Sequence, residues 1–155
     1  MAKKLFTKGN IIVTTPEEGY YGVAIVLDDA IPLELSPGRF SYPMNHILIT
    51  PLLFTKPVSM DDINIQDLKP LVFTQYFNNN GGLIFWRNKI CIDIYTNRNK
   101  ANLTVIGDID TTLIGDVPPL SWESMDDRFH LCGDVKSDLG REAYIQYCRI
   151  NNIDL

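Results

Sequence analysis

Two apolar runs separated by a short polar break open the chain and predict a β-hairpin. The runs cover residues 10–15 and 20–27, and β-branched and aromatic side chains fill both of them. Pro16 and Gly19 bound the break, as a short hairpin loop requires. The pattern therefore predicts an N-terminal strand pair within residues 9–29.

Prolines interrupt the next part of the chain. Residues 28–43 hold three prolines and one glycine, which exclude a long helix and predict a loop with a short extended piece. Residues 46–59 are apolar and β-branched but contain Pro51 and Pro57, so they predict an edge strand or two short strands joined by a kink. Residues 60–69 fit one helical turn and a polar loop equally well.

Residues 71–107 give the clearest strand pattern. Four apolar runs separated by polar turns predict an antiparallel meander, with a strong turn signal in the Asn and Gly cluster of residues 78–82. In the third run Ile90, Ile92 and Ile94 occupy alternate positions. This period of two predicts a half-buried strand, with the Ile side chains in the core and Asp93 on the solvent side.

An apolar face at spacings of three and four predicts one helix over residues 139–150. Its members are Leu139, Ala143, Tyr144, Tyr147 and Cys148. Ser137 or Asp138 can cap its start, and Asn151–Asn152 can end it. The predicted fold class is α+β: a single domain of residues 1–155 with a predominantly antiparallel β-sheet, built from the N-terminal hairpin and the central meander, and a C-terminal α-helix packed on it.

Composition fits a globular chain, with 45% hydrophobic and 21% charged residues in a total of 155. No run approaches the ~18 consecutive apolar residues of a membrane span, and no secretory signal is evident. Cys91, Cys132 and Cys148 are an odd number and cannot all pair internally. Reduced thiols are therefore expected, and with them a cytoplasmic location.

The net charge of −5 comes from one segment. Residues 108–138 hold eight acids and two bases, a net charge of −6, whereas the residues before them carry +1 and those after them are neutral. One interpretation is a solvated face that keeps the protein in solution. The other is a docking surface for a basic protein, with Trp122, Met125 and Phe129 as apolar anchors. Those side chains fit the core of a covering loop equally well.

Catalytic and cofactor motifs are absent from the sequence. His46 and His130 lack metal-ligand spacing, and there is no nucleophile elbow, P-loop or dinucleotide fingerprint. We therefore expect a protein that is not an enzyme and holds no cofactor or metal. Asp108 and Asp110 do lie on one side of a predicted strand, so a small enzyme using Asp108, Asp110 or His130 is the alternative, beside a structural adaptor. Basic residues are too few among the aromatic ones for nucleic-acid binding.

Short motifs in residues 9–119 resemble the immunity protein 26 family of bacterial polymorphic-toxin and contact-dependent inhibition systems. The N-terminal motif runs through Gly9, Pro16, Gly19, Tyr21, Gly22, Val26 and Leu27. Further matches are Pro51-Leu52-Leu53-Phe54, Val105-Ile106-Gly107 and the Pro118-Pro119 pair in the acidic stretch. The chain departs from the family at Thr15, where members often carry an apolar residue, and at Leu103-Thr104, where they tend to carry Trp.

The resemblance implies a cytoplasmic inhibitor that binds the C-terminal catalytic domain of a cognate toxin and occludes its active site. The toxin would often be a nuclease, which is basic because it grips phosphate. An acidic segment suits such a partner. The expected toxin-binding residues are Asp108, Asp110, Asp116, Trp122, Glu123, Asp126, Asp127, Phe129 and Asp134.

Overall fold

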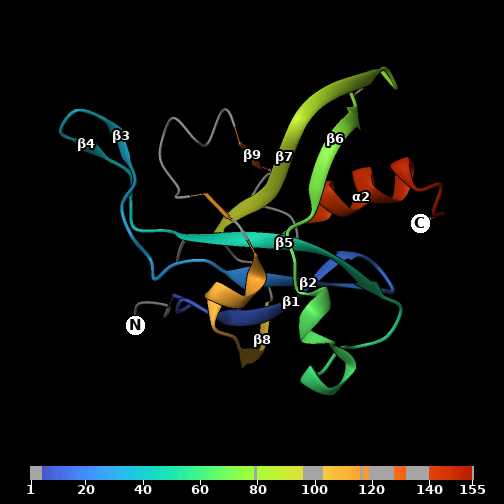
Figure 1. Cartoon of the computed structure of the whole chain (residues 1–155), viewed down its shortest axis with the longest axis horizontal. Helices are drawn as coiled ribbons and strands as arrows, with labels where there is room; N and C mark the ends of the chain where they lie inside the picture. Colours follow the sequence, from blue (N-terminus) through green and yellow to red (C-terminus); the bar gives the residue numbers. More distant parts are fainter. Residues whose placement is uncertain are drawn as a thin grey trace.

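One large sheet organises the molecule (Figure 1). The computed structural model describes residues 5–78, 80–95, 103–115, 117–118, 128–131 and 140–154. Seven of the described strands join in the order β6–β7–β5–β2–β1–β8, with β9 beside β7. Their bounds are β1 Asn10–Glu17, β2 Tyr20–Val26, β5 Asn45–Phe54, β6 Val72–Phe77, β7 Leu83–Tyr95, β8 Thr104–Asp108 and β9 Phe129–Leu131. All pairs are antiparallel except β7–β9, which is parallel.

The predicted N-terminal hairpin is present as β1 and β2, which pair from Ile11–Ile25 to Thr14–Gly22. Pro16 lies inside β1 at a shift in register between Thr14 and Glu17, a position where a strand tolerates proline. Gly19 forms the turn with φ of +83°, a conformation that favours glycine. Local sequence signals are therefore sufficient for this hairpin.

Both faces of the sheet are covered. One face packs under α2 (Arg141–Ile150), and its core includes Ile12, Ile47 and Tyr144. The other face packs under three short 3₁₀ turns, η1 (Met60–Asp62), η2 (Ile65–Asp67) and η3 (Thr111–Ile114), and its core includes Leu48 and Ile92. The predicted fold class, a mostly antiparallel sheet with a C-terminal helix packed on it, is confirmed.

The solvent-side position predicted for Asp93 is wrong because β7 is covered on both faces. Ile90 and Ile92 belong to the core on the 3₁₀-turn side, whereas Cys91 and Tyr95 are buried on the helix side. Asp93 lies between them and is only 2% exposed. A period of two does not separate core from solvent where a strand is covered twice.

The structure differs from the predicted meander at two points and from the predicted edge strand at a third. Residues 83–95 form one strand of 13 residues, so Arg87-Asn88 is not a turn. The strand β8 pairs with β1 at the far side of the sheet and not with β7. The strand β5 is central and not an edge: it meets β7 through residues 45–48, and Pro51 lies where its register with β2 shifts. A small separate hairpin, β3 (Glu34–Ser36) and β4 (Arg39–Phe40), projects from the loop before β5 (Figure 1).

Tyr144 anchors α2 at the shift in register between β2 and β5. The shift in register leaves Val23 outside the β2–β5 ladder, and the Tyr144 hydroxyl accepts from the Val23 N–H (2.9 Å) and donates to its carbonyl (3.0 Å). Thr50 Oγ1 also donates to that carbonyl (2.6 Å). Gly22 makes the approach possible, since a Cβ there would lie 2.3 Å from the Tyr144 ring. Gly22 therefore allows the helix to approach β2 closely.

Candidate functional site

The structure describes three of the nine predicted toxin-binding residues and places them in two regions. Asp108 ends β8, and Asp110 follows it two residues later; both are exposed. Phe129 is only 2% exposed and belongs to the core, so a role as a surface anchor is wrong for the described conformation. The remaining six, Asp116, Trp122, Glu123, Asp126, Asp127 and Asp134, lie outside the described residues, as do the predicted helix caps Ser137 and Asp138.

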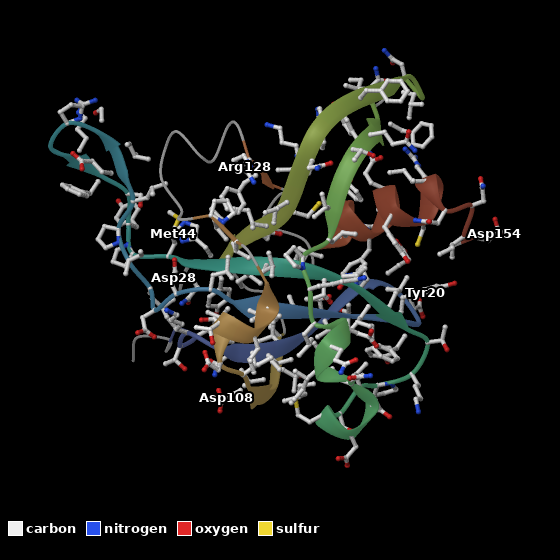
Figure 2. The ribbon with its side chains drawn as sticks, viewed as in Figure 1. Tyr20, Asp28, Met44, Asp108, Arg128 and Asp154 are labelled. Carbon is white, nitrogen blue, oxygen red and sulfur yellow. The ribbon has the colours of Figure 1, made fainter. Side chains whose placement is uncertain are left out.

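Two described parts of the acidic segment lie apart in the structure. Figure 2 shows Asp108 in the lower part of the molecule and Arg128 higher up, beside β7, where its carbonyl accepts from the Ile90 N–H. In the sheet, β8 and β9 are separated by β7, β5, β2 and β1. The described acids of this segment therefore gather at β8, and the candidate site is built there.

The strand β8 is exposed along most of its length. Among the described strands it pairs with β1 alone, and it is the last in the order of the sheet. Val105 is 45% exposed, and Leu113 of the adjoining η3 is 61% exposed. Large apolar side chains beside an open strand edge are typical of surfaces that bind another chain.

Carboxylates border this strand. Asn10 Nδ2 donates to Asp108 Oδ1 (2.6 Å), which fixes the carboxylate at the end of β8. Asp110 caps η3 by accepting from the Thr112 N–H (3.0 Å) and the Thr112 hydroxyl (2.8 Å). The Thr112 backbone N–H is the main cause that lowers the pKa of Asp110, and the charge of Lys8 adds to it. Both carboxylates are thus held in place by local hydrogen bonds.

A third acid comes from a distant part of the sequence. The Met60 side chain packs directly on Gly107 in β8, where a Cβ would lie 2.7 Å from Met60 Cγ. This contact joins Met60 of η1 to β8, and the next residue along the chain, Asp61, is exposed. Asp62 is partly neutralised by Lys56 at 3.5 Å. We call Val105, Asp108, Asp110, Leu113 and Asp61 the β8 surface.

The opposite edge of the sheet is covered at Phe77, the last residue of β6. There the Phe77 N–H donates to Gln146 Oε1 (2.8 Å), and Gln146 Nε2 donates to the Phe77 carbonyl (2.7 Å). The side-chain amide of α2 therefore takes the place of a neighbouring strand at this point of β6. Gln146 is only 1% exposed, so this polar side chain lies on the packed side of α2.

His130 does not join the carboxylates that the enzymatic alternative would combine with it. Its ring lies 4.7 Å from that of Trp86, which stacks on Tyr76 with centroids 4.3 Å apart. Burial lowers the pKa of His130; the charge of Glu142 opposes this shift, and that of Lys89 adds to it. Since β9 and β8 lie on different sides of the sheet, Asp108 and Asp110 are not within reach of this imidazole.

A second polar arrangement lies at the end of β2. The Asp28 carboxylate accepts from the His46 N–H (3.0 Å) and meets His46 Nδ1 at 2.5 Å. No described residue hydrogen bonds to His46 Nε2, and the ring is fully buried, so it has no access to a ligand. Asp28 also borders a cavity of ≈ 440 Å³, which is further lined by Lys8, Leu27, Ile31, Thr111, Thr112, Ile114, Gly115, Val117 and Pro118. Because its carboxylate already binds His46, we assign Asp28 a structural role.

Two of the three cysteines are buried and unpaired, namely Cys91 and Cys148. Burial raises the pKa of both thiols, which keeps them protonated and unreactive. Within the described part of the chain, no group of three or more His, Cys, Asp or Glu side chains lies close enough to hold a metal ion. In the same residues, no helix has the length and apolar character needed to cross a membrane.

Comparison with family models, with curated proteins and with solved structures gave no match. The residues that sequence reasoning missed are Asp61, Val105 and Gln146. Gly107 carries a usable signal for the first two, since a glycine inside a strand often marks close approach of another segment. Gln146 lies three residues after the buried Ala143, a spacing that places it on the packed side of α2.

Proposed function

We propose that this chain is an immunity protein, which binds a cognate bacterial toxin domain and neutralises it. The observation that carries the proposal is the β8 surface. It combines the exposed carboxylates of Asp61, Asp108 and Asp110 with the exposed side chains of Val105 and Leu113. The carboxylates favour a basic partner and speed its approach, and the apolar side chains supply area that loses water on binding.

The resemblance of residues 9–119 to an immunity family supports the same function. It implies a toxin that acts in the cytoplasm, often a nuclease with a basic groove for phosphate. An acidic protein seated over that groove excludes the nucleic acid by steric and electrostatic occlusion, with no chemical step of its own. Fast association and slow dissociation are sufficient for this task.

The direct test is a titration of the purified chain with a cognate toxin domain, to be sought at the C-terminus of a secreted protein encoded in the neighbouring gene. We expect a 1:1 complex with a Kd of about 1 nM or below, and a toxin activity that falls in proportion to the complex formed. Absence of a complex, or a complex in which the toxin stays fully active, would contradict the proposal.

A charge reversal tests the acidic surface. Asp108→Lys should slow association severalfold, and more at low salt, because it removes attraction to a basic partner. Asp154→Lys makes the same change of charge at the opposite side of the molecule (Figure 2) and is the matched control. Reversal at Asp126 and Asp127 extends the test to the residues outside the described structure. Equal association rates for all these variants would exclude the acidic segment from the interface.

A further inference from the structure

We propose that β8 holds the partner by strand pairing: its outer edge, Thr104–Asp108, accepts an extended, basic segment of the toxin domain as an additional antiparallel or parallel strand. This inference rests on the proposed function and specifies how the β8 surface is used. It predicts main-chain hydrogen bonds at the interface, and not contact between side chains alone.

Backbone direction shows which groups are available. The Ile109 N–H donates to the Gly9 carbonyl (2.9 Å), so residue 109 faces β1. Backbone groups alternate in direction along an antiparallel strand, and Asp108 therefore directs its N–H and carbonyl away from β1. No described residue pairs with that side of β8. The edge thus presents an unpaired donor and acceptor to solvent, as an added strand requires.

The edge strands β6 and β8 differ in the side chains that bind their outer backbone groups. At β6 the amide of Gln146 occupies both the N–H and the carbonyl of Phe77. At β8 no described side chain plays that part; the carboxylate of Asp108 instead binds Asn10, on the inner side. In the described part of the chain, a side chain therefore covers the β6 edge at Phe77 and none covers β8, which favours β8 as the edge that takes a partner.

Charge decides which partner fits. The exposed carboxylates of Asp108 and Asp110 lie at the end of β8, and the exposed Asp61 follows Met60, which packs on Gly107; the charge of one base, Lys8, acts on Asp110. A segment rich in Lys or Arg is attracted to this border. A second copy of the chain would bring the same acids against one another, and like charges disfavour that pairing. The occupant is therefore the basic toxin segment.

The test compares Asp108→Pro with Asp108→Ala in binding to the same toxin domain. Both variants lose the carboxylate, but only proline removes the outward N–H and places a ring on the edge. We expect the Kd of Asp108→Pro to exceed that of Asp108→Ala at least about tenfold, mainly through faster dissociation. Equal Kd values for two folded variants would overturn strand pairing while leaving the proposed function intact. A wild-type chain that binds no toxin would instead overturn the proposed function.

Hydrogen exchange in the wild-type chain gives a second readout that does not depend on the folding of a variant. Adding the toxin domain should slow amide exchange at Asp108 at least about tenfold, and should leave Phe77 at the opposite edge unchanged. Unchanged exchange throughout β8 in the complex would overturn the proposal. A concentration-dependent dimer of the free chain that Asp108→Pro dissociates would show that a second copy occupies the edge, which also overturns it.

Discussion

Asp93 makes the stability of the fold depend on pH in an unusual direction. Its carboxyl lies under α2, where Oδ2 accepts from the Gly140 N–H (3.2 Å) at the start of the helix and Oδ1 accepts from the Ile94 N–H (2.8 Å). Burial raises the pKa of Asp93 from 3.8 to about 7, although both backbone hydrogen bonds oppose the shift. The native state therefore keeps a proton that the unfolded chain releases above about pH 4.

The direction and the size of the pH effect on stability follow from this difference in bound protons between the native and unfolded states. Between pH 4 and pH 7 the native state binds one more proton at Asp93 than the unfolded state, so the free energy of unfolding falls as the pH rises. A rise from 3.8 to about 7 corresponds to a loss of about 4 kcal/mol across this range. Asp62 and Asp110 act in the opposite direction, because hydrogen bonds lower the pKa of each. A variant of Asp93 separates its contribution from theirs.

Asp93→Asn removes the titration and keeps a carbonyl oxygen for one of the two backbone donors. We expect its stability relative to the wild type to increase with pH, by about 4 kcal/mol between pH 4 and pH 8. Urea denaturation followed by tryptophan fluorescence at several pH values measures the difference. Asp67→Asn, an exposed carboxylate in η2, is the matched control. A stability difference between Asp93→Asn and wild type that stays constant with pH would refute the reasoning.

Three further substitutions test the packing of α2. Tyr144→Phe leaves the buried N–H of Val23 without its acceptor and should cost about 1–3 kcal/mol in urea denaturation. Gly22→Ala places a Cβ 2.3 Å from the Tyr144 ring and should cost about 3 kcal/mol or prevent folding. Gln146→Leu removes both hydrogen bonds to Phe77, which should lower stability by about 2 kcal/mol and increase light scattering as the β6 edge opens.

Two of these variants have a matched control in the chain. Tyr147→Phe changes a partly buried ring of the same helix and should alter stability by less than about 0.5 kcal/mol. Gly38→Ala meets open space and costs only the strain of a positive φ, about 1 kcal/mol. Equal effects of Tyr144→Phe and Tyr147→Phe would show that the Val23 hydrogen bonds contribute nothing. A β6 edge that stays monomeric in Gln146→Leu would contradict its role in closing that edge.

Local signals in the sequence predict the parts of the fold that local physics decides. The β1–β2 hairpin follows from its turn residues, and α2 follows from its apolar spacing and the Asn151 end, where Nδ2 donates to the Tyr147 carbonyl (2.8 Å). The order of the strands could not be predicted in this way, because no local pattern in residues 103–108 specifies that β8 pairs with β1. The covering of β7 on both faces likewise depends on segments far from it, and this is why Asp93 was placed wrongly.

The candidate site could likewise be predicted only in part. Its charge is visible in the sequence, and Asp108 and Asp110 do lie exposed at the end of β8. The shape of the site is not visible in the sequence, because Asp61 belongs to a distant segment that meets β8 through the contact of Met60 with Gly107. Phe129 shows the limit of composition most clearly: an aromatic residue among acids fits an interface and a core equally well, and in the structure it lies in the core.

A growth assay tests the central claim most directly. The cognate toxin domain is induced in a bacterial host that also expresses the wild-type chain, Asp108→Ala or Asp108→Pro at equal levels. Neutralisation through the open edge of β8 predicts full growth with the wild type, near-full growth with Asp108→Ala and poor growth with Asp108→Pro. Arrest in the presence of the wild-type chain would contradict the proposed function, and equal growth with all three would contradict the part assigned to β8.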